Sequence, residues 1–244
     1  MFYDLNLSGD ESDAFLQRER LAMAVRLGYD CLATNHQAAD RLAESDRCTH
    51  TPFDATSLVA AGGSGVREAL RSQQGLIRTH APPRQVQQLS RLTLAVDEAA
   101  VAAAALAPGA PLPAGYDIVA VQPMSERVLQ QACTALDVDV ITFDLARRLP
   151  YRLRPAALAA AVKRGVALEL CYAPALRDEA SRRTLFSNAA ALVRATRGHG
   201  IILSSGARAA FELRGPYDAV NLATLLGLRA DQAQVAVSSR CADV

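Results

Sequence analysis

The sequence predicts an α/β protein with a (β/α)8, TIM-type barrel fold, on three observations. Strand-like and helix-like hydrophobic periods alternate along all 244 residues, as they do where crossover helices join parallel strands. Eight strand-like segments can be counted, and no Gly-x-Gly-x-x-Gly turn follows the first, which favours a closed barrel over an open doubly wound sheet. The length suits one barrel, so we expect a single domain over residues 1–244.

The eight predicted strands are short and rich in Val, Ile, Leu and Ala, as expected of strands buried on both faces. They cover residues 2–7, 29–34, 91–96, 117–122, 139–143, 167–172, 200–204 and 234–238. Only six residues follow the last of these segments, so we expect either that the eighth helix of the barrel is incomplete or that the barrel closes in a different way.

Five helices are predicted between the strands, at residues 13–27, 126–136, 155–164, 182–197 and 216–226. The last one has clear ends. Pro216 suits the first helical turn, where its missing N–H has no partner to lose, and Gly227 can take the left-handed conformation after the helix.

The connection between the second and third strands is longer than an ordinary βα loop. We expect a long variable insertion at about residues 36–89, with glycines at 62–65 and prolines at 82–83 as loop signals, and we expect it to be mobile or bound to a partner.

Composition excludes several classes of protein. Half of the residues are apolar and about a fifth are charged, which is typical of a folded globular protein. The five cysteines contain no Cys-x-x-Cys pair, which argues against a disulfide framework or a zinc site and favours a reducing compartment. The uncharged stretch at 99–116 contains three prolines, so we predict no membrane span and no membrane partner.

Few residues suggest catalysis. The best candidate set for a divalent metal is Asp4, Asn6, His36, Asp144 and Glu169, which would lie at the carboxyl ends of barrel strands. A structural interpretation is favoured, in which Asp4 and Asn6 satisfy loop backbone groups and Glu169 pairs with an arginine. We therefore assign no catalytic residue and no metal ligand.

Charge is divided unevenly along the chain, although the total is only +1. Residues 1–144 carry 11 arginines and 18 acidic residues, a net charge of −7, whereas residues 145–244 carry a net charge of +8. This asymmetry indicates that the second part of the chain faces a polyanion.

Arginine-rich loops follow the fifth and sixth strands and should be neighbours on one face, because both lie at strand carboxyl ends. We predict that this face binds RNA, with guanidinium groups on phosphates and tyrosine on unpaired bases. The predicted RNA-binding residues are Arg147, Arg148, Tyr151, Arg152, Arg154, Arg177, Arg182, Arg183, Arg208 and Arg214. The alternative is a solvated surface with local acidic partners.

Several segments, in order, resemble the thirty-kilodalton protein subunit family of ribonuclease P, known in archaea as ribonuclease P protein component 3. They are residues 27–29, 33–36, 116–121, 136–139, 143–150, 168–174, 201–205 and 214–222. The resemblance covers nearly the whole chain except the loop after His36.

The resemblance implies a TIM barrel of PHP-like type, related to metal-dependent phosphoesterases, that is not itself catalytic. It implies a subunit of ribonuclease P, and of ribonuclease MRP, which supports removal of the 5′ leader from precursor tRNA and processing of rRNA. Catalysis would belong to the holoenzyme RNA and its Mg²⁺, with no cofactor held by the chain itself.

The implied partners are the ribonuclease P or MRP RNA, precursor tRNA, a small α/β partner subunit and other holoenzyme proteins. The implied location is the nucleus and nucleolus, or the cytoplasm for an archaeal source. Related metalloenzymes carry His-x-His where this chain has Asp4-Leu5-Asn6, which agrees with lost metal chemistry. Two alternatives remain open, a metal-dependent phosphoesterase and a structural scaffold that docks acidic proteins.

Overall fold

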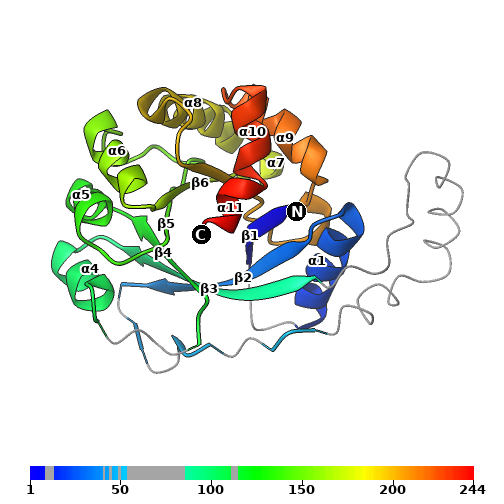
Figure 1. Cartoon of the computed structure of the whole chain (residues 1–244), viewed down its shortest axis with the longest axis horizontal. Helices are drawn as coiled ribbons and strands as arrows, with labels where there is room; N and C mark the ends of the chain where they lie inside the picture. The colour runs from blue at the N-terminus through cyan, green and yellow to red at the C-terminus, as the bar shows by residue number, and fades with distance from the viewer. Residues whose placement is uncertain (9–13, 41, 44–45, 49–50, 54–85, 111–114) are drawn as a thin grey trace, which may run out of the picture.

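The computed structural model describes residues 1–8, 14–40, 42–43, 46–48, 51–53, 86–110 and 115–244. Its seven strands are all parallel and form one sheet in chain order. The sheet curls into a nearly closed barrel with helices around its outside (Figure 1). This arrangement confirms the predicted TIM-type barrel.

The strands are β1 (Tyr3–Ser8), β2 (Cys31–Ala39), β3 (Gln87–Val96), β4 (Ile118–Pro123), β5 (Val140–Thr142), β6 (Ala167–Cys171) and β7 (Ile201–Ser204). The helices are α1 (Ala14–Leu27), α4 (Ala99–Leu106), α5 (Glu126–Thr134), α6 (Pro155–Lys163), α7 (Pro174–Arg177), α8 (Glu179–Thr196), the 3-10 helix η2 (Ala210–Glu212), α9 (Pro216–Leu225), α10 (Ala230–Ala236) and α11 (Ser239–Ala242).

Each of the five predicted helices is present, as α1, α5, α6, α8 and α9. Pro216 occupies the first turn of α9, and Gly227 has a φ of 108°, as predicted for the two ends of that helix. Helix α4 was not predicted. It consists almost entirely of alanine, the residue with the highest helix propensity, but its alanines give no amphipathic period.

The predicted eighth strand at 234–238 is wrong, because these residues begin inside helix α10. Ala233, Ala236 and Val237 are buried at helical spacing, while Val235 is 40% exposed. The Gln232 side chain accepts a hydrogen bond from the Arg229 N–H and so caps the start of this helix. The short apolar run is therefore one face of a helix.

The eighth unit of the barrel is built from α9, α10 and α11 in place of a strand and a single helix. Of the two expectations for this end of the barrel, the different closure is therefore confirmed and the incomplete eighth helix is wrong. At one end of β1, the Tyr3 N–H donates to the carbonyl of Val237. At the other end, the Ser8 N–H donates to the carbonyl of Ala207, and an isolated parallel bridge joins Leu7 to Ala207. The turn after β7 and the residue after α10 thus fill the gap between the edges of β1 and β7.

Strands β2 and β3 pair over nine consecutive residue pairs, from Cys31 with Gln87 to Ala39 with Ala95. Both strands are longer than predicted. Their polar residues continue the hydrogen-bonded pairing beyond the apolar residues on which the prediction was based. The predicted insertion at 36–89 therefore overlaps both strands. Its glycine and proline signals at 62–65 and 82–83, and its expected mobility, lie outside the described residues.

The barrel interior has an apolar floor. Leu5, Cys31, Ala33, Ile118, Ala120, Val140, Ala167, Ile202 and Cys241 form one buried cluster. Most of these residues lie near the amino ends of their strands, and Cys241 of α11 is only 3% exposed among them. Helix α11 therefore closes the barrel at the end opposite the strand carboxyl termini (Figure 1).

Within the described residues, no helix combines the length and the apolar character needed to cross a membrane.

Replacing Cys241 by Asp should lower the free energy of unfolding by at least about 3 kcal/mol, because it places an unpaired carboxylate in the barrel floor. The matched control is Ala242→Asp, which adds the same group at the exposed neighbouring position. Urea denaturation measures both. Similar small losses in the two variants would show that α11 does not seal the barrel.

Candidate functional site at the barrel mouth

An arginine and a glutamate pair across the interior above the apolar floor. Arg91 lies on β3 and Glu169 on β6, and neither side chain is exposed to solvent. The guanidinium meets both carboxylate oxygens, with Nη1–Oε1 at 2.6 Å and Nη2–Oε2 at 2.7 Å. Burial alone raises the pKa of Glu169, but the charge and hydrogen bonds of Arg91 outweigh that effect and lower it. The pair is therefore ionised and bidentate.

A chain of hydrogen bonds leads from this ion pair towards the open end of the barrel. Asn6 Nδ2 donates to Glu169 Oε2 at 2.9 Å, and Asn35 Nδ2 donates to Asn6 Oδ1 at 2.9 Å. The Thr93 hydroxyl donates to Asn35 Oδ1 at 2.7 Å and accepts from Arg91 Nε at 3.1 Å. Each amide is held in one orientation by its neighbours, so the upper interior is rigid and polar.

The donor set considered for a divalent metal does not fit one. Glu169 is neutralised by Arg91, Asp144 lies 3.5 Å from the Arg147 guanidinium, and His36 pairs with Asp46 at 2.9 Å. The described residues contain no group of three or more His, Cys, Asp or Glu side chains suited to a metal. A guanidinium supplies the positive charge that the buried carboxylate needs.

The structural interpretation of the same residues is confirmed for Glu169, which pairs with an arginine, and for Asp4. Asp4 Oδ1 accepts from the backbone N–H of Ser205 at 2.9 Å and of Asn6 at 3.3 Å. The Asn6 side chain bonds other side chains, so the expected backbone role applies only to Asp4. Burial raises the pKa of Asp4 to about 6, and its Oδ2 atom is buried without a hydrogen-bond partner.

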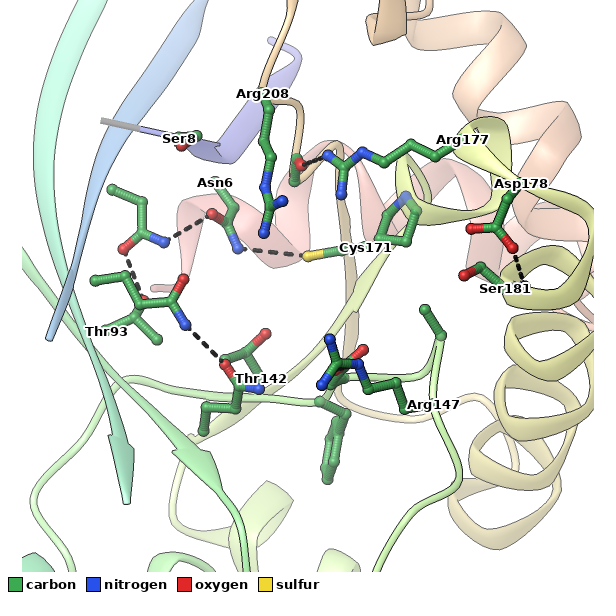
Figure 2. A pocket seen from close by; sticks show the side chains of 18 residues that line it. Asn6, Ser8, Thr93, Thr142, Arg147, Cys171, Arg177, Asp178, Ser181 and Arg208 are labelled. Carbon is green, nitrogen blue, oxygen red and sulfur yellow. Dashed lines mark hydrogen bonds and ion pairs between the residues drawn. The ribbon is translucent and has the colours of Figure 1, made fainter. Parts of the chain in front are cut away.

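A pocket of about 300 Å³ opens above this network, at the carboxyl ends of the strands. We call it the mouth pocket. Its lining residues are Asn6, Ser8, Asn35, Gln37, Thr93, Gln122, Thr142, Phe143, Asp144, Ala146, Arg147, Cys171, Pro174, Arg177, Asp178, Ser181, Gly206 and Arg208. The guanidinium groups of Arg147 and Arg208 point into it from opposite sides (Figure 2).

Arg177 forms a fixed part of the wall. Its Nε and Nη2 atoms lie 2.7 and 3.0 Å from the two carboxylate oxygens of Glu212, and Nη2 also donates to the carbonyl of Gly206 at 3.0 Å. Glu212 in turn accepts from the backbone N–H of Arg208 at 2.7 Å. The Arg177–Glu212 pair thus holds the turn after β7 against α7.

The comparisons with known proteins agree with this geometry. Residues 1–244 match the family model described as RNase P subunit p30. The chain belongs to this ribonuclease P subunit family. It is 35% identical over 240 residues to "Ribonuclease P protein subunit p30" of Mus musculus, covering 98% of this chain and 83% of that protein.

Other relatives are longer than this chain. It is 36% identical over 253 residues to "Protein GAMETOPHYTE DEFECTIVE 1" of Arabidopsis thaliana, covering 98% of this chain but 42% of that protein. It is 36% identical over 148 residues to "Ribonuclease P/MRP protein subunit RPP1" of Saccharomyces cerevisiae, covering 61% of this chain and 49% of the relative. The chain thus spans about half the length of these two relatives or less.

A solved structure shares the fold. A chain of the "cryo-EM structure of archaeal Ribonuclease P with mature tRNA" superposes with a TM-score of 0.62 at 12% sequence identity. The match covers 98% of this chain and 90% of that chain. At this sequence identity the likeness shows that the two chains share the barrel fold, and it carries no statement about individual residues.

The two arginine-rich loops are neighbours, as predicted. Asn188 of α8 donates to the carbonyls of Leu145 at 2.9 Å and Arg147 at 2.8 Å, which ties the loop after β5 to the helix that follows β6. The exposed members of the predicted RNA-binding set are Arg147, Arg148, Arg152, Arg154, Arg177, Arg182, Arg183 and Arg208. Four of the set have acidic partners, in the pairs Arg147–Asp144, Arg154–Glu126, Arg177–Glu212 and Arg183–Glu179, of which Arg147–Asp144 is the longest at 3.5 Å.

Arg214 and Tyr151 differ from the exposed arginines. Arg214 is half-buried, and its Nη1 donates to the carbonyls of Phe211 and Leu213. Tyr151 was predicted to stack on bases, and this is wrong, because the residue is only 8% exposed and its hydroxyl donates to the carbonyl of Pro123 at 3.0 Å. Its place between the partly buried Leu149 and Leu153 is the sequence signal for a core residue.

The sequence did not identify the amides and hydroxyls of the mouth pocket. Gln37, Thr93, Gln122 and Thr142 come from four different strands, and no motif joins them along the chain. The sequence analysis also did not identify Arg91. An arginine within an apolar strand predicts a buried ion pair, because a charge buried there needs a partner of opposite charge.

Replacing Glu169 by Gln should lower the free energy of unfolding by about 3–5 kcal/mol, because it leaves the Arg91 charge buried without a carboxylate. The double variant Arg91→Met with Glu169→Met should recover most of this loss, since it removes both charges at once. Equilibrium denaturation of the wild type, of Arg91→Met and Glu169→Met singly, and of the double variant measures the cycle. A double variant as unstable as the sum of these two singles contradicts a coupled pair.

Replacing Asp4 by Asn should stabilise the protein increasingly as the pH rises from 4 to 7. The pKa of Asp4 is raised only in the folded state, so the wild-type protein is most stable below the unfolded pKa. Its free energy of unfolding then falls by about 3 kcal/mol as the pH rises through the folded pKa of about 6. Asn cannot ionise and escapes this loss. The free energy of unfolding as a function of pH measures the effect, and Asp97→Asn, at an exposed position, is the control.

Proposed function

We propose that this chain acts as a protein subunit of ribonuclease P, and of ribonuclease MRP, in which RNA carries out catalysis. The match to the RNase P subunit p30 family over residues 1–244 carries the proposal. Relatives named as subunits of ribonuclease P and of ribonuclease P/MRP support both assemblies. Its role in them is to support 5′ leader removal from precursor tRNA and the processing of rRNA.

The chain contributes no catalytic group in this proposal, and it holds no cofactor of its own. The interior that would hold metal ligands in a barrel phosphoesterase contains the Arg91–Glu169 ion pair. The Mg²⁺ that the reaction needs is then bound by the holoenzyme RNA. This favours the subunit role over the alternative of a metal-dependent phosphoesterase.

The arginine-rich face around the mouth pocket contacts the RNA backbone in this proposal. Arg147, Arg148 and Arg152 are exposed on the loop after β5, and Arg208 is exposed beside the pocket. Arginine contacts to phosphates position an RNA and give a salt-dependent affinity without reading its sequence.

Other surfaces would dock a small α/β partner subunit and further holoenzyme proteins. Phe15, Phe211 and Tyr217 are 67%, 78% and 69% exposed, and large exposed aromatic side chains favour protein contacts. A scaffold role thus accompanies the RNA contacts. The corresponding location is the nucleus and nucleolus, or the cytoplasm if the source is archaeal.

The RNA-facing side is tested by the triple variant Arg147→Ala, Arg148→Ala, Arg152→Ala. Its affinity for ribonuclease P RNA should fall, and the magnitude of the negative slope of log K against log salt concentration should decrease by roughly two to three, at about 0.7–0.9 for each of three lost phosphate contacts. Filter binding across a salt series, with and without partner subunits, measures this.

The matched control removes three exposed positive charges near the opposite end of the barrel, with Lys163→Ala, Arg194→Ala and Arg229→Ala. The control should keep the wild-type slope. Equal slopes for the two triple variants would show that the binding is diffuse or lies elsewhere.

A further inference from the structure

We propose that the mouth pocket binds one unpaired ribonucleotide of an RNA strand, with its phosphate between Arg147 and Arg208 and its base edge against Gln37 and Gln122. The inference rests on the proposed function and adds a specific site to it. It is carried by the juxtaposition, in one small pocket, of two inward-pointing guanidinium groups with the hydrogen-bonded amides of Gln37 on β2 and Gln122 on β4.

Arg208 is fixed through its backbone while its guanidinium points into the pocket. Its N–H donates to Glu212 Oε2 at 2.7 Å, and its carbonyl accepts from Arg20 Nη1. Arg147 is similarly held by its carbonyl, which accepts from Asn188 Nδ2 at 2.8 Å. Its own side chain is 86% exposed, and the contact to Asp144 is 3.5 Å long. Both side chains are thus placed for an anion without being committed to a close ion pair (Figure 2).

The pocket accepts one phosphate and no more. Arg147, Arg177 and Arg208 line it together with two carboxylates, those of Asp144 and Asp178. Arg177 is neutralised by Glu212, and Asp178 is engaged as the cap of α8, where it accepts from the Ser181 N–H at 2.7 Å. The remaining two guanidinium groups and two carboxylates balance, so the lining has no net charge and its positive charge is concentrated at Arg147 and Arg208. A single phosphodiester suits this balance, whereas a polyphosphate would meet the carboxylates.

The wall formed by the strands can recognise a base. Gln37 Nε2 donates to Gln122 Oε1 at 3.3 Å, and Gln122 Nε2 donates to Met124 Sδ at 3.9 Å. The Gln37 carbonyl and the second hydrogen of the Gln122 amino group are left as an acceptor and a donor for a ligand. Amide groups of this kind pair with the edges of bases. Below them, Asn35 and Thr93 are held by the network above the Arg91–Glu169 pair, so the floor does not have to reorganise on binding.

The pocket volume selects an unpaired nucleotide. About 300 Å³ is at the lower end of the range for small-ligand pockets and excludes a duplex. The bases of an RNA helix are stacked and paired, so none of them can enter this pocket. A bulged or looped-out nucleotide can enter it, because its base is free of the helix. The expected ligand is therefore a nucleotide at a bulge, a loop or a single-stranded junction.

The test compares two RNA hairpins that differ only by one bulged nucleotide, using fluorescence anisotropy with the full chain. Wild-type protein should bind the bulged hairpin roughly tenfold more tightly than the fully paired one. The variant Arg147→Ala with Arg208→Ala should lose this preference, and Gln37→Ala with Gln122→Ala should reduce it. The matched control, Arg148→Ala with Arg152→Ala, should weaken binding to both hairpins equally and keep the ratio.

The outcomes separate the pocket from the general RNA role. Equal, salt-sensitive binding of both hairpins by wild-type protein overturns the nucleotide site and leaves the proposed function standing. No measurable RNA binding, alone or with partner subunits, overturns both. A free nucleoside monophosphate or inorganic phosphate that competes as well as the bulged hairpin overturns the RNA assignment, since it makes the pocket a site for small phosphorylated molecules.

Discussion

The buried ion pair between Arg91 and Glu169 is the interaction on which the rest of the barrel interior depends. Both charges are fully removed from water, so each is tolerable only because the other is present at hydrogen-bond distance. The pair joins β3 to β6 across the barrel, and Asn6, Asn35 and Thr93 are ordered above it by successive hydrogen bonds. The geometry of the mouth pocket follows from this network.

The same pair determines what chemistry the site can support. In a barrel metalloenzyme, convergent carboxylates and imidazoles at the strand carboxyl ends are neutralised by a metal ion. Here a guanidinium takes that place, and His36 and Asp144 are engaged with other side chains. The polar mouth is left with hydrogen-bonding amides and two inward-pointing arginines, which are the groups that the proposed contact to an RNA phosphate uses.

Closure of the barrel depends on a different constraint, which is that the open edges of β1 and β7 must be covered. The backbone of Ala207 bonds the mouth end of β1, and the carbonyl of Val237 bonds its other end. Cys241 of α11 then fills the apolar floor between them. Among the described residues, seven strands are therefore sealed by helices at the floor, and the mouth pocket lies at the opposite end beside the arginine-rich loops.

The hydrophobic periodicity of the sequence, together with the residues that end helices, determined the seven strands and the helices α1, α5, α6, α8 and α9. The sequence also determined that arginines cluster after β5 and β6. These features are local, so each could be predicted from neighbouring residues. Only the tertiary structure decided that 234–236 end a helix and are not part of a strand, that Tyr151 is a core residue, and that Arg91 meets Glu169 across 78 positions of chain. Burial and charge pairing between distant strands have no local signature, because they depend on how the sheet curves to bring those strands together.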